Sequence, residues 1–365
     1  MRFGIAYGAD AVYMAGTRFG MRAAATNFDD NALREGIAYA HAHGVKCYIT
    51  VNIMPSNRAL PALPAYLELL QDAGADALII ADVGVLRMAR RYAPKVPVHI
   101  STQTSILNHE AANYWADEGA ERIVLARELS LEEIAEIRAK TPKELEIEAF
   151  VHGAMCISYS GRCLISQYMT GRDANHGACA QPCRWNYSLM EEKRPGQFFP
   201  VEEDGRGTYL YNSKDMCMIE HIPELIRAGI TSFKIEGRNK TAYYAACVTG
   251  AYRAAIDTYK KDPENFVLPQ FCRDEVNKVS HREYYTGFYF GNQENGQHYG
   301  DSQYIREYEV VGMPVECDDS GKAVFALKNR FFDGEELELI QPGQAPYVFR
   351  AENVTDDEGT KRELF

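Results

Sequence analysis

The chain has 365 residues, of which 46% are hydrophobic and 25% charged, the composition of an ordinary globular protein. Its net charge of -12 argues against non-specific nucleic-acid binding as the main activity, because Lys and Arg supply contacts to phosphate. No stretch has the roughly 20 apolar residues of a membrane span. The first residues also lack the basic and apolar regions of a signal peptide. We therefore expect a cytoplasmic protein with no membrane partner.

A helix that ends at Gly and is followed by an apolar strand recurs along the chain. Gly suits the left-handed residue that ends a helix, and an apolar run suits a buried strand of a parallel sheet. The pattern occurs at Gly8, Gly44, Gly74, Gly119 and Gly229. Two further apolar runs, at 97–102 and 144–151, bring the number of predicted strands to seven.

Helices between these strands predict parallel βαβ units. One helix opens with a capping box, in which Ser130 precedes Glu133 by three residues. Seven strands with one position unfilled predict a (β/α)8 TIM-like barrel that lacks its first strand, and a doubly wound open sheet is the alternative.

Changes in composition and in the helix and strand patterns along the chain predict the domain organisation. The TIM-like barrel is expected over residues 1–262, with a cysteine-rich insertion at about 153–217. A linker is predicted at 263–303. Short alternating runs over 304–365 predict a small C-terminal β-barrel module, whose end looks truncated. Within the barrel, helical periodicity and strand alternation place Cys247 and Cys47 in the core.

Alternation along two strands brings charged side chains to one face. Glu148 and His152 share a face of the run 144–152, and Lys234, Glu236 and Arg238 share a face of the run 231–238. Barrel active sites lie at the carboxyl ends of the strands. We therefore expect Glu148, His152, Lys234 and Glu236 as acid or base candidates. The alternative is an interior ion pair of Lys234 with Glu236 or Glu148.

Five of the nine cysteines are clustered, at Cys156, Cys163, Cys179, Cys183 and Cys217. The cytoplasm keeps thiols reduced, so such a cluster favours metal binding or redox chemistry over disulfides. Structural zinc sites use close cysteine pairs, which only Cys179 and Cys183 approach. Iron–sulfur clusters accept wider spacing and need four thiolates, so five candidates leave one spare. Zinc binding and unligated buried thiols are the alternatives.

A thiol nucleophile is a further interpretation. His152 precedes Cys156 by four residues and His176 precedes Cys179 by three, so a Cys–His pair is conceivable. No third orienting group is recognisable. The common metalloprotease and serine-hydrolase motifs do not occur in the sequence.

Motifs around these residues resemble the collagenase-like peptidase family U32. The run from Glu148 to Ser166, E-x-F-x-x-G-A-M-C-x4-G-x-C-x-I-S, resembles the family signature. Three later stretches are also similar: N-S-K-D-M-C, F-K-I-E-G-R-N-K and S-H-R-E-Y-Y-T-G-F-Y. Near the C-terminus, K-N-R-F-F-D-G-E-E-L-E-L is similar to the family's small β-barrel. The family's usual first strand, E-L-L-A-P-A-G, is not present.

The resemblance implies a function and a cofactor. Family members of this type include tRNA hydroxylation proteins, which install 5-hydroxyuridine at the wobble position without dioxygen, with prephenate implicated as the hydroxyl source. Relatives act in rRNA cytidine and ubiquinone hydroxylation, and several hold a [4Fe–4S] cluster on four cysteines. Carried over to this sequence, Cys156, Cys163 and Cys217 are expected ligands. Cys179 is favoured as the remaining ligand, with Cys183 as its alternative.

The expected function is therefore iron–sulfur-dependent hydroxylation of RNA, most directly of a tRNA uridine. Arg22, Arg127 and Arg238 could hold a dicarboxylate such as prephenate by bidentate pairing. RNA is the expected macromolecular partner, together with a paralogue of the family in a hetero-complex. A collagenase-like peptidase and a non-catalytic accessory subunit are the alternative functions.

Overall fold

The structure is a computed structural model in which seven parallel strands carry the candidate site. It describes residues 1–22, 27–156, 158–159, 161–184, 202–204, 207–209, 213–291, 304–320, 322–356, 358–361 and 364. The parallel strands are β1 (Ala11–Ala15), β2 (Lys46–Val51), β3 (Ala77–Ile80), β4 (Val98–Ile100), β5 (Arg122–Val124), β6 (Glu146–Ala154) and β10 (Ser232–Ile235). They pair in this order, and β10 follows β6. The prediction of seven parallel strands is confirmed.

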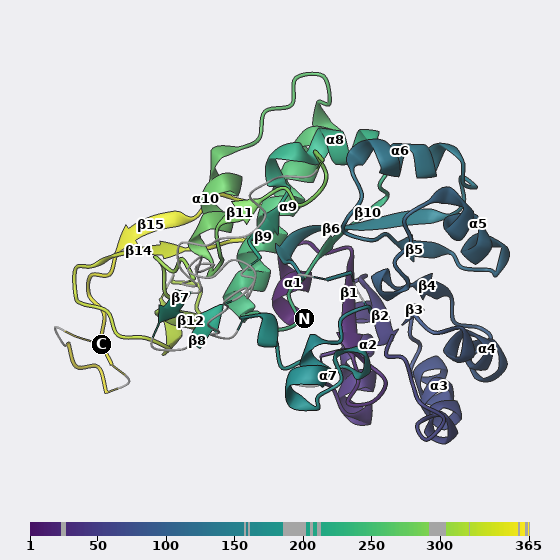
Figure 1. Ribbon diagram of the computed structural model, residues 1–365. Helices are drawn as coiled ribbons and strands as arrows, with labels where there is room; N and C mark the ends of the chain where they lie inside the picture. Colours follow the sequence, from purple (N-terminus) through teal and green to yellow (C-terminus); the bar gives the residue numbers. More distant parts are fainter. Residues whose placement is uncertain are drawn as a thin grey trace, which may run out of the picture.

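Helices follow the strands and lie along the outside of the sheet (Figure 1). They are α1 (Arg2–Ala6), α2 (Asp30–Ala42), α3 (Leu63–Asp72), α4 (Val83–Tyr92), α5 (His109–Asp117), α6 (Leu131–Ala139), α8 (Ile222–Arg227) and α9 (Ala242–Lys261). Short 3-10 turns lie at η1 (Leu60–Ala62), η2 (Thr102–Thr104), η3 (Ala174–His176), η4 (Pro182–Arg184) and η5 (Ile219–His221). None of the helices in the described part of the chain combines the length and apolar character that a membrane span requires.

The local signals of the sequence account for these elements. All five glycines predicted to end helices have positive φ, between +69° and +94°. The capping box forms at the start of α6, where Ser130 and Glu133 satisfy each other's backbone N–H groups. Apolar side chains from the strands and helices form one large core, which includes the predicted core residues Cys47 and Cys247. The helix and strand pattern of the sequence is therefore confirmed.

The two ends of the parallel sheet approach each other without pairing. The Tyr13 hydroxyl of β1 donates to the Ile235 carbonyl of β10 at 3.4 Å, and the Lys234 ammonium lies 4.5 Å from the Tyr13 ring centroid. Neither β1 nor β10 pairs with a further parallel strand among the described residues. Because the strand order never reverses, the arrangement is TIM-barrel-like and not doubly wound. A closed barrel is not seen in the part of the chain that the structure describes.

The region predicted as a linker, residues 263–303, contains regular structure in its described part. Helix α10 (Gln270–Lys278) packs on α9 and buries Cys272 and Val276. Strand β11 (Tyr284–Tyr285) pairs parallel with β9 (Asp215–Cys217), which in turn pairs antiparallel with the end of β6. This segment therefore extends the main sheet and covers α9.

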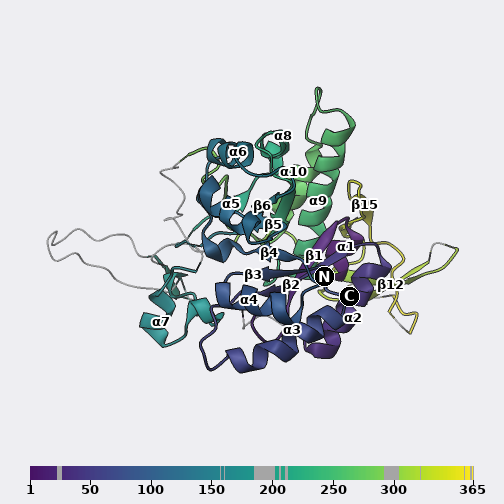
Figure 2. The same ribbon diagram turned by 90° about the vertical axis from the view of Figure 1, so that its right-hand side faces the viewer.

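The C-terminal segment forms two antiparallel pairs, as its alternating pattern predicts. Strand β12 (Gly312–Cys317) pairs with β13 (Ala323–Leu327), and β14 (Glu336–Leu339) pairs with β15 (Tyr347–Arg350). A closed small β-barrel is not seen in the part of the segment that the structure describes. Figure 2 shows these pairs and α7 (Ile165–Thr170) on opposite sides of the main sheet. The domain boundaries themselves stay a prediction.

The cysteine-rich insertion packs on loops at the carboxyl ends of the strands. It contains α7 and the short antiparallel strands β7 (Glu202–Asp204) and β8 (Gly207–Tyr209). Gly161 has φ +75°, and a Cβ there would lie 2.8 Å from the Gln103 carbonyl oxygen. Gly177 has φ +85°, and its Cβ would lie 3.0 Å from the Gly20 carbonyl oxygen and 3.4 Å from the Arg22 nitrogen. The backbone of the insertion therefore touches the backbone of the loops after β1 and β4.

Replacing Gly177 with Ala should loosen the insertion from the loop that carries Arg22. Gly171 is the matched control, because it has φ +70° and nothing lies within 4 Å of its Cβ position. Both substitutions carry the cost of a left-handed residue, roughly 1–2 kcal/mol. Only in Gly177→Ala does the new Cβ also press against the backbone of residues 20–22. The amide hydrogens of residues 20–22 should therefore exchange faster in this variant than in Gly171→Ala. Equal exchange rates would contradict the contact.

Candidate functional site

A cavity of about 670 Å³ lies beneath the insertion at the carboxyl ends of the parallel strands. This volume is in the range that holds a small-molecule substrate. Its walls come from the strand ends, from the cysteine-rich insertion and from residues Tyr304 and Arg306, which precede the C-terminal β pairs. Segments distant in sequence thus meet at the end of the sheet where TIM-barrel active sites lie.

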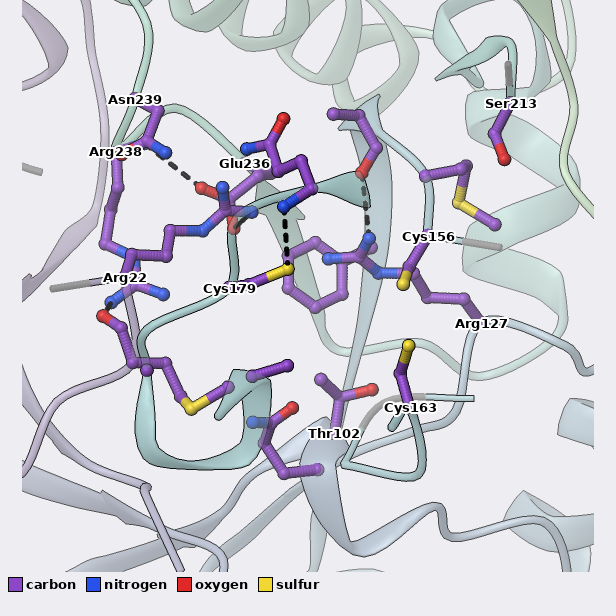
Figure 3. Close-up of a pocket in the computed structure, with 18 of the residues that line it drawn as sticks. Arg22, Thr102, Arg127, Cys156, Cys163, Cys179, Ser213, Glu236, Arg238 and Asn239 are labelled. Carbon is purple, nitrogen blue, oxygen red and sulfur yellow. Dashed lines mark hydrogen bonds and ion pairs between the residues drawn. The ribbon is translucent and has the colours of Figure 1, made fainter. Parts of the chain in front are cut away.

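Four of the five clustered cysteines line this cavity: Cys156, Cys163, Cys179 and Cys183. Figure 3 shows the first three pointing into it, with the thiols of Cys156 and Cys163 turned toward one another. Cys217 is half-buried against the hydrophobic core, and its backbone pairs with His152. No group of three cysteine, histidine or acidic side chains in the described part of the chain lies close enough to share one metal ion.

The thiols fit an iron–sulfur cluster in donor type and number. Such a cluster needs four thiolates, and four cysteines line the cavity. The backbone around them provides N–H groups, and the Gln181 nitrogen donates to the Cys179 sulfur at 3.4 Å. Donors of this kind stabilise the sulfur ligands of a cluster. The described positions place four thiols on one cavity and leave Cys217 behind its wall.

The rest of the cavity is strongly cationic. Its described lining contains one carboxylate, Glu236, and six cationic side chains: Arg22, Arg127, Lys234, Arg238, Lys240 and Arg306. The three arginines that the sequence predicts as substrate-binding are therefore brought together around Glu236. The buried Nε atoms of Arg127 and Arg238 have no hydrogen-bond partner in the structure. A cavity with this charge inside an acidic chain is suited to an anionic ligand.

Glu236 organises the arginines of the cavity. Arg22 approaches its carboxylate at 3.2 Å, and the Arg238 backbone N–H donates to it at 3.1 Å. The Arg22 backbone has φ +69°, which is costly for a residue with a side chain and is typical of positions held for function. Arg127 lies with its guanidinium 3.8 Å from the Phe150 ring centroid and donates to the Ala154 carbonyl at 2.9 Å.

Glu148 lies beneath the cavity and does not line it. Its side chain is 4% exposed and binds the Lys234 ammonium at 2.5 Å, the Arg122 guanidinium at 2.9 Å and the Ser232 hydroxyl at 2.8 Å. Burial alone would raise the pKa of Glu148, but Lys234 and Arg122 outweigh it and lower the pKa to about 2. The interior ion pair expected as the alternative therefore forms, and Glu148 positions Lys234.

His152 is also removed from the cavity. Its ring is 1% exposed and lies against the rings of Tyr244, Tyr252 and Tyr284. The Tyr284 hydroxyl lies 3.3 Å from Nε2, and Nδ1 has no hydrogen-bond partner. Burial lowers the pKa of His152 to about 3, so the ring is neutral at physiological pH.

The Cys–His pairs considered from the sequence do not form in the described residues. The ring of His152 pairs with a tyrosine, and Nδ1 of His176 lies 2.6 Å from the Asp173 carboxylate. Neither histidine hydrogen-bonds to the cysteine that follows it in sequence. Activation of a thiol by an adjacent imidazole base therefore has no support in this geometry.

Two of the four predicted acid or base residues, Lys234 and Glu236, line the cavity. The sequence interpretation missed several other lining residues, among them Lys240, Tyr304 and Arg306. Lys240 follows the carboxyl end of β10 within F-K-I-E-G-R-N-K, so its position after a strand was an available signal. Tyr304 and Arg306 reach the cavity through a contact between distant segments that no local pattern encodes.

Replacing Glu236 with Gln should reduce stability at neutral pH and flatten the acid-induced loss of stability. Burial would raise the pKa of Glu236, but Arg22, Arg238 and Arg127 lower it from 4.5 to about 2. A carboxylate of this kind stabilises the fold above pH 4.5, and the contribution is lost as the pH falls toward 2. The loss at pH 7 should be on the order of 3 kcal/mol.

Urea unfolding between pH 7 and pH 2 measures both effects. Glu118→Gln is the control, because Glu118 and Arg90 form an exposed ion pair at 2.8 Å, a type that contributes about 0–1 kcal/mol. This control should keep the wild-type dependence on pH. An equally steep loss of stability in Glu236→Gln and the wild type would contradict the assignment.

Comparison with known proteins shows which proteins this chain is similar to. A tRNA hydroxylation protein P1 of Bacillus subtilis is 39% identical over 363 residues, which cover 99% of this chain and 85% of that protein. The tRNA hydroxylation protein P2 of the same organism is 35% identical, over 78% of this chain and 91% of its own length. The 23S rRNA 5-hydroxycytidine C2501 synthase of Escherichia coli is 39% identical, over 86% of this chain and 46% of that protein.

Family models match almost the whole chain. Residues 1–299 match the model of peptidase family U32, and residues 306–364 match the model of the C-terminal domain of that family. The five clustered cysteines, Glu236 and the three arginines around it lie within the first match. Arg306 is the first residue of the second match. The chain is therefore a member of peptidase family U32.

Proposed function

We propose that this protein hydroxylates RNA, most directly a tRNA uridine at C5, without dioxygen. The observation that carries the proposal is one cavity in which four thiols face six cationic side chains and a single carboxylate. Relatives that share most of this chain are named for tRNA hydroxylation, and another is named for rRNA hydroxycytidine synthesis. We place the reaction in the cytoplasm, where thiols stay reduced.

We assign a [4Fe–4S] cluster to Cys156, Cys163, Cys179 and Cys217, with Cys183 as the alternative to Cys179. Three of these thiols line the cavity, and Cys217 lies in β9 beside the end of β6. Cys183 also lines the cavity, so it competes with Cys217 as well as with Cys179 for a place as ligand. A cluster at this position would supply one-electron redox chemistry next to the substrate.

We assign prephenate, a dicarboxylate, as the hydroxyl donor. Arg22, Arg127 and Arg238 can pair with carboxylates in bidentate fashion, and two of them carry Nε atoms without a partner. In the overall reaction, a C–O bond of the donor breaks and the C5–O bond of uridine forms. The hydrogen that leaves C5 is balanced by a hydrogen that the donor gains, so the base is oxidised as the donor is reduced.

We assign the proton transfers of this reaction to side chains that line the cavity. Lys234 and Glu236 line the cavity, whereas Glu148 and His152 lie behind its wall. We therefore propose Lys234 and Glu236 as the acid or base groups and Glu148 as the residue that positions Lys234. His152, a residue of β6, supports the site by packing its ring against three tyrosines.

The two alternative functions have less support from the structure and the comparisons. Peptidase activity would use a cysteine nucleophile, but the rings of His152 and His176 contact a tyrosine and an aspartate and not the cysteines that follow them in sequence. An accessory role would make this chain the partner of a catalytic paralogue. The pair of P1 and P2 relatives in one organism makes such a hetero-complex a reasonable partner hypothesis.

Replacing Cys156 with Ala should remove the cluster. Protein purified without oxygen should be brown and contain about four iron and four sulfide per chain, and the variant should lose both. Cys317→Ala is the control, because Cys317 is an exposed cysteine of β12 that does not line the cavity. Iron, sulfide and the visible spectrum provide the measurement.

Single alanine variants of Cys179, Cys183 and Cys217 assign the remaining ligands. We expect iron loss in Cys179→Ala and Cys217→Ala, and full retention in Cys183→Ala. If Cys183→Ala loses iron and Cys217→Ala retains it, Cys183 is a ligand in place of Cys217. Colourless wild-type protein with stoichiometric zinc would contradict the cluster altogether.

Deleting the gene for this protein should lower 5-hydroxyuridine in tRNA when no paralogue remains. Mass spectrometry of tRNA nucleosides provides the measurement. The wild type and Cys317→Ala should restore the modification, and Cys156→Ala should fail to do so. Undiminished modification in the deletion strain would remove tRNA uridine as the substrate. Peptide cleavage by the purified protein that Cys156→Ala abolishes, with an unchanged tRNA profile, would favour the peptidase.

A further inference from the structure

The rim of the cavity carries an aromatic side chain whose surroundings are built to hold it in place. Tyr304 lines the cavity and is 43% exposed, so one part of its ring remains open. It precedes the C-terminal β pairs and lies far in sequence from the strand ends that form the opposite wall. Neither the sequence motifs nor the cation cluster explains why an aromatic ring occupies this place.

The Tyr304 ring is supported by two cations. The Lys240 ammonium lies 5.2 Å from the ring centroid, and the Arg282 guanidinium lies 5.8 Å from it. Both cations are themselves fixed by Asp215, to which Arg282 donates at 2.7 Å and which lies 3.6 Å from Lys240. Cation–π contacts of this kind orient an aromatic ring.

The backbone beside Tyr304 is fixed as well. The Ile305 nitrogen donates to the His281 carbonyl at 2.8 Å, and the His281 nitrogen donates to the Ile305 carbonyl at 3.3 Å. His281 is buried and its ring stacks on Tyr284 at 4.0 Å. The ring of Tyr304 is therefore anchored through its backbone and its supporting cations before any ligand binds.

We propose that Tyr304 stacks a base of the RNA substrate at the mouth of the cavity. This inference rests on the proposed function and names how the same site holds its substrate. Enzymes that modify a base draw it out of the stack, and proteins that bind single-stranded RNA stack its bases on aromatic side chains. The cations Lys240 and Arg306 lie on the same rim and suit the adjacent phosphates.

The charge of the rim favours RNA over a peptide as the occupant. Six cationic side chains and one carboxylate line the described cavity, whereas the whole chain carries a net charge of -12. A polyanion would be attracted to this opening and repelled by the remaining surface. A peptide of mixed charge would gain no comparable selectivity.

Tyr308 provides a matched control four residues further on. It is 42% exposed, and the Lys278 ammonium lies 5.2 Å from its ring centroid. The exposed fraction thus matches that of Tyr304, and one cation lies over the Tyr308 ring where two lie over Tyr304. Tyr308, however, is not among the residues that line the cavity. A general loss of aromatic surface should affect both positions equally, whereas base stacking should affect only Tyr304.

Replacing Tyr304 with Ala should weaken binding of an anticodon stem-loop RNA that carries uridine at the wobble position. A stacked base contributes about 1–3 kcal/mol, so the dissociation constant should rise about 5- to 150-fold. Tyr304→Phe and Tyr304→Trp should bind within a few-fold of the wild type, and Tyr308→Ala should bind like the wild type. Fluorescence anisotropy of labelled RNA provides the measurement.

A second measurement reports stacking itself. With 2-aminopurine beside the target uridine, the wild type should quench the fluorescence of the analogue, and Tyr304→Ala should leave it bright at saturating protein. Iron content and the urea midpoint of Tyr304→Ala should match the wild type, which separates stacking from a structural effect. Tyr304→Phe binding as weakly as Tyr304→Ala would overturn the inference, because the hydroxyl and not the ring would then be required.

The outcomes separate this inference from the proposed function. If the wild type forms 5-hydroxyuridine and Tyr304→Ala binds and hydroxylates the stem-loop equally well, the stacking role is wrong and the function stands. If the wild type neither binds the stem-loop nor affects tRNA modification, the proposed function itself fails. Loss of peptide cleavage in Tyr304→Ala without any effect on RNA binding would assign the rim to a peptide and overturn the inference.

Discussion

The buried carboxylate of Glu148 is the interaction on which the interior of the sheet depends. It joins three neighbouring strands, because it accepts from Arg122 of β5 and from Ser232 and Lys234 of β10. Four charged or polar groups deep between strands would be costly without mutual pairing. Their pairing holds the Lys234 ammonium at the floor of the cavity. The charged interior that made Glu148 look like a catalytic residue is therefore the support for one.

The excess of cationic side chains above this floor makes the cavity more positive than the rest of the acidic chain. An acidic surface repels anions, and the cavity is the place where cationic side chains outnumber carboxylates among the described lining residues. Glu236 partly neutralises the arginines: it pairs with the Arg22 guanidinium and accepts from the Arg238 backbone N–H. The proposed dicarboxylate would pair with the same guanidinium groups, so in that proposal Glu236 preorganises the arginines and also competes with the ligand.

Sequence patterns predicted the strands, their helix-ending glycines and the inward faces of β6 and β10, because these follow from local geometry. They could not predict how deep each inward residue lies. Glu148 and His152 share the predicted face, but tyrosines of α9 and β11 cover His152, and paired cations cover Glu148. Depth is set by these distant segments. The same limit explains why the sequence left the choice between Cys179 and Cys183 open.

The site forms where three segments meet, and backbone contacts join them. Gly177 brings the insertion against the loop of Arg22, Gly161 brings it against Gln103, and Ile305 pairs with His281 at the opposite rim. The cysteine-rich insertion therefore lies in direct backbone contact with the loop that carries Arg22. That loop also holds Arg22 in a left-handed backbone conformation, so the insertion packs directly beside a strained residue of the cavity. Backbone packing alone therefore ties the position of the insertion to that of Arg22.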